Sequence, residues 1–234
     1  MTKALYNDDG YLKTCTASVV RINEKGIVLD STVFYAMGGG QPGDSGLLRL
    51  ADGREIVITD THKSDDGIVH IPAADSEIPQ EGDVVTVEID WDRRYAHMRM
   101  HTCLHLLCAV VNAPVTGGSI GIEKGRLDFD VPQPILSKDE ITAALNQLIQ
   151  ENHTVTTRWI TDAELDAQPE LVKTMAVQPP RGSGRVRLLA IEGVDIQPCG
   201  GTHVSNTGEI GLVRVRKIEK KSRLNRRVIL EFAS

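Results

Sequence analysis

The chain has 234 residues, of which 41% are hydrophobic and 25% charged, and its formal net charge is −6. This composition is typical of a folded soluble protein, and the length suffices for one large domain or two modest ones. No apolar run approaches the roughly 18 residues that a membrane span needs, and the net acidity argues against a protein that coats nucleic acid. We therefore expect a cytoplasmic protein with no membrane partner.

The counts of cysteines and aromatic residues narrow the chemistry further. Four cysteines are too few and too widely spaced for a disulfide framework, and in a reducing compartment a functional cysteine is more often a metal ligand or a nucleophile. Only 4% of the residues are aromatic, so we do not expect stacking of bases on aromatic side chains to be the main mode of RNA recognition.

Residues 1–90 have the pattern of an all-β domain. Short apolar segments such as LLRL, EIVIT and IVHI are separated by Asp-Gly dipeptides at 52–53 and 66–67, and each dipeptide is a strong hairpin signal. Several short strands with closely spaced turns are typical of a small barrel or sandwich. We predict a small N-terminal β-barrel that carries the segment GGGQ at 38–41.

Residues 91–234 change to an α+β pattern. Helical spacing extends from Asp92 to about Val111, and a second helix begins at Ser137, where Glu140 completes a capping box. A further capping box at 161–164 predicts a third helix. Strands are expected over GRLDFDV, TVTTRWI, RVRLLAIEG, GLVRVRKIE and RRVILEF, and QPPRGSGR is expected as an exposed loop. We predict an antiparallel sheet with packed helices, so the fold class is α+β.

Three histidines, His97, His101 and His105, lie at helical spacing in the first predicted helix. Residues four apart share a helix face, so HMRMH and HTCLH are both candidate ligand pairs. The zinc protease pattern requires a Glu directly after the first His, and Met98 or Thr102 stands there instead, which disfavours a metalloprotease. A pair of this kind on its own is more often structural than metal-binding.

A second segment, CGGTH at 199–203, again places a thiol and an imidazole four residues apart. Its glycines permit a tight loop that brings both side chains together. With HTCLH it offers three nitrogens and one sulfur, which is a donor set that zinc favours. The remaining histidines, His62, His70 and His153, follow no pattern, and we interpret them as surface residues.

The segment RVRKIEKKSRLNRR (214–227) contains eight Lys or Arg, and Glu219 is its only acid. Such a basic strip predicts a face that binds phosphates. A solvated strand edge is an equally supported alternative, because charged side chains also protect edges from aggregation. The candidate phosphate ligands are Arg214, Arg216, Lys217, Lys220, Lys221, Arg223, Arg226 and Arg227.

HTCLH and CGGTH, preceded by FYAMGGGQPGDSG at 34–46, closely resemble the freestanding alanyl-tRNA editing proteins of the AlaX type. The resemblance covers nearly the whole chain, and the N-terminal domain is typical of the medium-sized class. The chain departs from the family at Ala36-Met37, where the motif usually reads Pro-Glu. The resemblance implies the editing-domain fold of threonyl- and alanyl-tRNA synthetases for residues 91–234.

The resemblance also implies an activity, a cofactor and a partner. The activity is hydrolysis of the ester in mischarged tRNA(Ala) that bears serine or glycine. The cofactor is one Zn²⁺ per chain, held by His101, His105, Cys199 and His203. His97 is then expected to pack beside the site rather than to bind the metal.

An editing site must accept serine and refuse alanine, and a buried polar partner for the serine hydroxyl would do so because alanine leaves it unpaired. Thr116 and Ser119 in PVTGGSIG are candidate partners. Alternatively, they are loop hydroxyls bonded to nearby backbone.

Gly38, Gly39 and Gly40 permit close approach of a substrate, and Gln41 offers both a donor and an acceptor, so it is the candidate catalytic residue. The resemblance implies that this loop reaches over the metal site. The alternative is a simple glycine turn between strands.

The role of the metal and the class of function stay open at this point. Catalytic zinc normally keeps one open position, whereas four protein ligands describe a closed, structural site. The chain is therefore either a deacylase, a non-catalytic tRNA-binding module with structural zinc, or a metal-dependent hydrolase of small esters or amides. The preference between serine and glycine, the selection of tRNA(Ala) and the oligomeric state do not follow from the sequence.

Overall fold

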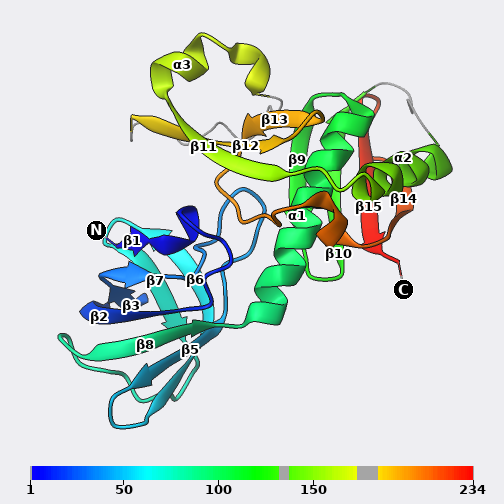
Figure 1. Ribbon diagram of the computed structural model, residues 1–234. Coiled ribbons are helices and arrows are strands. Elements are labelled where there is room, and N and C mark those ends of the chain that lie inside the picture. Colours follow the sequence, from blue (N-terminus) through cyan, green and yellow to red (C-terminus); the bar gives the residue numbers. More distant parts are fainter. Residues whose placement is uncertain (1, 132–136, 173–183, 234) are drawn as a thin grey trace. The chain divides into compact units, whose positions relative to one another are not determined.

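The computed structural model describes residues 2–131, 137–172 and 184–233. The chain divides into two compact units, residues 1–95 and 96–234 (Figure 1). Among the described residues, no helix combines the length and the apolar character required to cross a membrane.

The N-terminal unit contains the predicted barrel, which is closed by six antiparallel strands in the order β2-β3-β7-β6-β5-β8 (Figure 1). These strands are β2 (Thr14–Asn23), β3 (Gly26–Leu29), β5 (Gly46–Leu50), β6 (Glu55–Ser64), β7 (Gly67–Pro72) and β8 (Val84–Ile89), with a short parallel pair β1 (Lys3–Ala4) and β4 (Ser31–Thr32) beside the 3₁₀ turn η1 (Leu5–Asn7). Alternate residues fill the interior: Val85, Val87 and Ile89 of β8 are buried, and the residues between them are exposed or half-buried.

His70 lies inside this unit, so our interpretation of it as a surface residue was wrong. Its side chain is fully buried, with Nε2 2.8 Å from the Thr32 hydroxyl and Nδ1 3.0 Å from the Ile27 carbonyl oxygen. Burial lowers the pKa of His70 to about 4, so the ring is neutral near pH 7. Both ring nitrogens have partners, which makes His70 a packed, structural histidine.

The C-terminal unit contains two antiparallel sheets, a four-stranded one in the order β14-β15-β10-β9 and a three-stranded one in the order β11-β12-β13. The strands are β9 (Val115–Ile120), β10 (Lys124–Asp130), β11 (Val155–Thr161), β12 (Arg185–Ile191), β13 (Asp195–Pro198), β14 (Val213–Lys220) and β15 (Asn225–Phe232). The helices are α1 (Trp91–Val111), which begins in the first unit, α2 (Lys138–Gln150) and α3 (Asp162–Asp166), with 3₁₀ turns η2 (Pro169–Leu171) and η3 (Thr207–Ile210). The α+β class is confirmed.

Both predicted capping boxes are present at the starts of α2 and α3. The Ser137 hydroxyl accepts from the Glu140 N–H at 3.2 Å, and the Glu140 carboxylate accepts from the Ser137 N–H at 2.7 Å. Helix α2 then buries Ile141, Leu145 and Ile149 on one face. The predicted loop QPPRGSGR lies mostly outside the described residues.

Candidate metal centre

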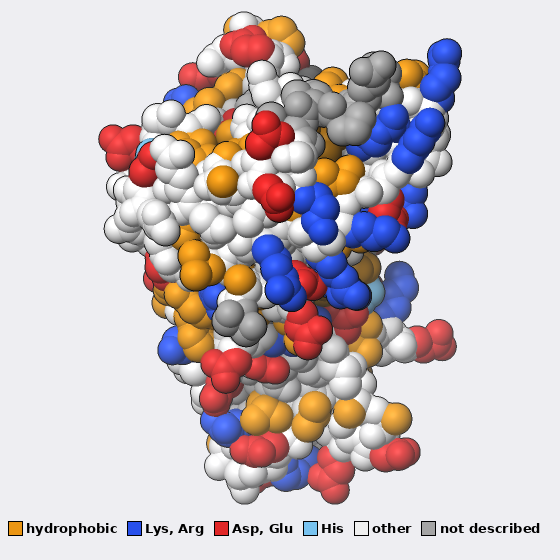
Figure 2. Space-filling view, turned by 90° about the vertical axis from the view of Figure 1, so that its right-hand side faces the viewer, with side chains coloured by type: hydrophobic (Ala, Val, Ile, Leu, Met, Phe, Trp, Pro, Cys, Tyr) orange, Lys and Arg blue, Asp and Glu red, His pale blue; other side chains and the backbone are white. Residues whose placement is uncertain are grey.

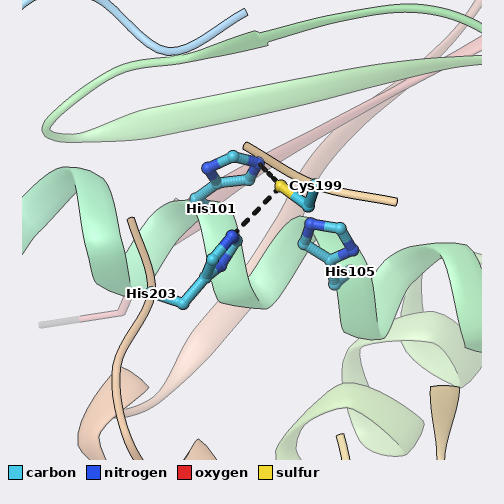
Figure 3. Close-up of side chains that lie close together, drawn as sticks. All are labelled: His101, His105, Cys199 and His203. Atoms are coloured by element: carbon cyan, nitrogen blue, oxygen red, sulfur yellow. Dashed lines mark hydrogen bonds between the residues drawn. The ribbon is translucent and has the colours of Figure 1, made fainter. Parts of the chain in front are cut away.

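Four side chains from two distant segments meet in the C-terminal unit (Figure 3). Helix α1 contributes His101 and His105, which project from the same face, and the segment after β13 contributes Cys199 and His203. One ligand atom of each lies within 4.8 Å of those of the other three. The Cys199 sulfur is 3.5 Å from Nε2 of His101 and 3.1 Å from Nε2 of His203.

Thr102 connects the CGGTH segment to helix α1. Its hydroxyl donates to the Met98 carbonyl at 2.9 Å, as threonines in helices often do, and lies 3.3 Å from Nδ1 of His203. The Val204 N–H donates to the Thr102 hydroxyl oxygen at 3.3 Å. Thr102 therefore fixes the position of the His203 ring. We did not predict this role, although Thr102 stands where a zinc protease has its Glu.

Arg187 of β12 holds the other end of the segment. The Cys199 N–H donates to the Arg187 carbonyl at 3.0 Å, which extends the β12–β13 ladder by one residue. The Arg187 guanidinium is buried and donates to the carbonyl oxygen of Gly201 at 2.6 Å and to that of Cys199 at 3.5 Å. The sequence does not distinguish Arg187 from a surface arginine, because its position depends on the pairing of three strands.

The electrostatics of the cluster favour neutral imidazoles. The pKa values of His101 and His203 are well below their usual range, first because the rings are buried and then because of neighbouring imidazoles and Arg187. Removal from water raises the pKa of the Cys199 thiol to about 11, an effect partly offset by the Gly201 N–H and Arg187. Neutral imidazoles present their lone pairs to a cation, and binding at the sulfur would release a proton.

The four residues could hold a metal ion, and their donor types suit zinc. Zinc bonds of about 2.0–2.3 Å in a tetrahedron place neighbouring donors about 3.3–3.8 Å apart, and the two sulfur–nitrogen distances of 3.5 and 3.1 Å lie close to that range. Nitrogen and thiolate donors suit zinc better than magnesium or calcium. Within the ranges that the structure describes, no other group of three or more such side chains converges in this way. His97 is also buried but does not belong to the group.

Thr116 and Ser119 lie in strand β9, so our expectation of a loop there was wrong. The Thr116 hydroxyl donates to the Asp128 carbonyl at 3.1 Å and lies 2.6 Å from the Asn225 amide nitrogen, as in the alternative interpretation of a hydroxyl satisfied by its neighbours. Ser119 is exposed. The proposed contact of these hydroxyls with a serine substrate stays a prediction.

The GGGQ segment belongs to the N-terminal unit, where it forms a tight turn. Gly38 and Gln41 exchange backbone hydrogen bonds of 3.1 and 3.0 Å, while Gly39 and Gly40 have φ of 57° and 83°, the pattern of a type I′ turn. The Tyr35 hydroxyl donates to the Gly38 carbonyl at 2.9 Å. The Gln41 side chain is fully buried, and its catalytic role stays a prediction.

Ala36 and Met37 stand where the family motif usually has other residues. Ala36 is buried, and Met37 is 48% exposed. The Met37 N–H donates to the Thr61 carbonyl at 2.8 Å, so β6 fixes the entry to the turn.

The basic strip lies on the hairpin of β14 and β15, and β14 is an edge strand. Lys and Arg side chains gather on the face shown in Figure 2, interspersed with acidic ones. Six of the eight cations are exposed: Arg214, Arg216, Lys217, Lys220, Lys221 and Arg223. Arg226 is buried and donates to the carbonyl oxygens of Ser222 and Asn225, and Arg227 pairs with Asp128 at 2.7 Å.

Several exposed cations of the strip already have acidic partners. Arg214 and Arg216 pair with Glu231, and Lys217 and Lys221 pair with Glu219. These ion pairs are consistent with a solvated strand edge. They are equally consistent with a phosphate-binding face on which the cations leave their carboxylates to contact phosphates. The structure therefore leaves both interpretations of the strip open.

Comparison with known proteins agrees with the geometry. Residues 8–93 match the family model of class II (A) tRNA synthetases, and residues 186–229, which include Cys199 and His203, match that of the threonyl and alanyl tRNA synthetase second additional domain. The chain is 39% identical to the alanyl-tRNA editing protein AlaX-M of Methanosarcina mazei, over 97% of this chain and 95% of that protein.

Two further relatives are informative. AlaX-M of Methanosarcina acetivorans is 38% identical over 97% of this chain and 98% of that protein. The alanine–tRNA ligase of Pyrobaculum calidifontis is 36% identical over 94% of this chain but only 25% of the ligase, so the likeness is to one part of that larger protein. This chain therefore belongs to the AlaX-M family of alanyl-tRNA editing proteins.

Proposed function

We propose that this chain is a zinc-dependent deacylase that hydrolyses the aminoacyl ester of mischarged tRNA(Ala), bearing serine or glycine. The observation that carries the proposal is the convergence of His101, His105, Cys199 and His203 in a chain of the AlaX-M family. A pocket sized for alanine rejects glycine and serine only weakly, by roughly 1–3 kcal/mol, so a second, hydrolytic site is needed.

The residues in and around the cluster have different roles in this proposal. His101, His105 and His203, each 7% exposed, would hold the ion from within the unit together with Cys199, which is half-buried. When bound, zinc would polarise the ester carbonyl and increase the acidity of a water molecule. Thr102 and Arg187 keep His203 and Cys199 in place through the contacts described above.

Contact with tRNA is assigned to the exposed part of the basic strip. Phosphate contacts position a substrate without specifying its sequence, and they weaken at higher salt because the release of counterions from the nucleic acid then gains less entropy. Lys220 and Arg223 are exposed and have no ion pair with a described acidic residue, so they can contact phosphate without breaking one. Replacing both by Gln should weaken tRNA binding. It should also reduce the slope of log K against log[salt] by about two, because two phosphate contacts are lost.

The proposal is tested by incubating zinc-loaded protein with Ser-tRNA(Ala), Gly-tRNA(Ala) and Ala-tRNA(Ala) and following the loss of each amino acid. We expect rapid loss of serine or glycine and slow loss of alanine. The methyl ester of serine serves as a further substrate, and we expect it to react much more slowly than the tRNA ester.

Two results would contradict the proposal and identify its alternatives. Binding of tRNA without turnover of any ester by folded, zinc-loaded protein would indicate a tRNA-binding module with structural zinc. Equal rates on the methyl ester and the tRNA ester would indicate a hydrolase of small esters.

A further inference from the structure

Three residues form one row across the three-stranded sheet. Trp159 of β11 is the register partner of Arg187 of β12, and the Cys199 N–H bonds to the Arg187 carbonyl at 3.0 Å on the far side. Side chains that are directly opposite in neighbouring antiparallel strands lie on the same face of a sheet. The side chain of Trp159 therefore shares its face with the cysteine of the metal cluster.

The other face of this sheet is covered. Ile160, Val186 and Leu188 alternate with the residues of the row and form a buried cluster with Leu165 of α3, which lies above the sheet in Figure 1. The burial of that face accounts for the apolar side chains on it. It does not account for Trp159, which points the opposite way.

Trp159 is 44% exposed, whereas Ile160 beside it is only 5% exposed. The guanidinium carbon of Arg185, the next residue but one along β12, lies 5.2 Å from the centre of its ring. A large flat ring at the surface, with a cation over one of its faces, is a combination that can bind an unpaired base on the other face next to a phosphate. A tryptophan ring that stays in water forgoes the hydrophobic stabilisation that its burial would give, and a smaller side chain would forgo less. An exposed tryptophan is therefore better explained by a ligand that covers it.

We propose that Trp159 is the stacking site for the base of the terminal adenosine of the aminoacylated tRNA. The inference rests on the proposed function, which places the ester of that same nucleoside at the metal cluster. Neighbouring strands are about 4.8 Å apart, so the backbone of Trp159 lies roughly 10 Å from that of Cys199, two strands away. That separation suits a nucleoside whose sugar carries the ester at one side and whose base extends to the other.

The chemistry of the substrate agrees with this placement. The aminoacyl end of tRNA is single-stranded, so its last base is free to stack on a protein ring, and stacking tolerates any base because each has a π face. The Arg185 guanidinium over the same ring adds a positive charge at this place, which favours the phosphate that precedes the terminal nucleoside. The low aromatic content of the chain is compatible with this role, because one ring at one site suffices.

The first test compares Trp159→Ala, Trp159→Phe and, as a control of similar exposure in the same unit, Leu212→Ala, which is 55% exposed in the native chain. For Ser-tRNA(Ala) deacylation we expect Trp159→Ala to raise KM about tenfold with little change in kcat, and Trp159→Phe to recover most of the loss. Leu212→Ala should match the native protein. An unchanged KM in folded Trp159→Ala would overturn the proposal.

The second test needs no catalysis. The chain has two tryptophans, so Trp91→Phe leaves Trp159 as the only one. We expect the trinucleotide CCA to quench the fluorescence of this variant in a saturable manner, and an abasic analogue of the last nucleotide to quench far less. Equal quenching by both, or none, would overturn the stacking site. Quenching in a protein that deacylates no tRNA would instead contradict the proposed function and leave the stacking site intact.

Discussion

The turn Gly38–Gln41 in the barrel and the segment Cys199–His203 at the metal cluster both contain adjacent glycines, but different forces shape them. In the turn, Gly39 and Gly40 have φ of 57° and 83°, a region that other residues enter at a cost. Gly200 and Gly201 are not among the described residues with positive φ, and a Cβ added at Gly200 would meet no atom within 4 Å.

The comparison shows that one loop is determined locally and the other by its partners. The turn closes on itself through the backbone hydrogen bonds between Gly38 and Gln41, so its shape between these residues follows from its own sequence. The CGGTH segment takes its shape from Arg187 on one side and Thr102 on the other. In our sequence argument the glycines themselves bend the metal-binding loop, and this is incorrect for Gly200. Contacts with residues far away in the sequence shape the loop instead.

The largest effect is expected from the cluster itself. Cys199→Ala removes the only sulfur donor, and we expect the protein to lose its bound metal and more than about a hundredfold of its deacylation rate, with the fold retained. Metal content by mass spectrometry and single-turnover rates measure both effects. Cys15→Ala, at a half-buried cysteine of the barrel, is the matched control and should change neither. Retention of metal and rate in Cys199→Ala would show that the sulfur is not a ligand.

Arg187 tests whether the CGGTH segment depends on its partners. Arg187→Met keeps much of the volume but removes the donors to the carbonyl oxygens of Gly201 and Cys199. Loss of groups that orient ligands typically weakens metal binding about 10–100-fold, and we expect a decrease of that size in a competition titration with a chelator. Arg158→Met, at an exposed arginine of the neighbouring strand, should bind zinc as the native protein does. Equal affinities would mean that Arg187 does not hold the loop.

His70 provides a matching test of the barrel, whose interior also contains a neutral imidazole. Its pKa is about 4 in the fold and about 6.5 when unfolded, so the unfolded chain binds more protons between these values and stability is lost as the pH falls. From pH 6.5 to 5 we expect the native protein to lose about 1–2 kcal/mol more than His70→Gln. Urea unfolding of the two proteins at both pH values measures the difference. Identical pH dependence would contradict a neutral, buried His70.

The smallest effects separate the two kinds of glycine. Gly40→Ala forces a side chain into positive φ and should lower the free energy of unfolding by about 1–2 kcal/mol, whereas Gly200→Ala should change it by less than about 0.5 kcal/mol. Denaturant titrations of both variants give the comparison. Equal costs would indicate that the two loops are shaped alike.

What could be predicted from sequence follows the same division. The capping boxes at Ser137 and Thr161 and the Asp-Gly hairpins involve neighbours in the chain, and they were confirmed. The spacing of four residues in HTCLH and CGGTH indicated candidate ligand pairs but left His97 open, and the set of His101, His105, Cys199 and His203 was predicted from the resemblance to the AlaX-type editing proteins. Strand β9 was not predicted, because Gly117 and Gly118 weaken its pattern and its pairing with β10 supplies the structure.

The residues that the sequence did not reveal are those whose environment is assembled from afar. His70 is buried against Thr32, which lies 38 positions earlier. Trp159 and Arg187 acquire their places only when strands β11, β12 and β13 align in register. No local spacing encodes such a row, so its members resemble ordinary surface residues until the sheet is formed.

The most direct test of the central claim is to remove the metal and restore it. Protein stripped by a chelator is titrated with zinc while deacylation of Ser-tRNA(Ala) and the circular dichroism spectrum are followed together. We predict that activity is absent without metal, returns in proportion to zinc up to one ion per chain, and does so while the spectrum stays constant. Full activity in stripped, folded protein would contradict a metal-dependent deacylase.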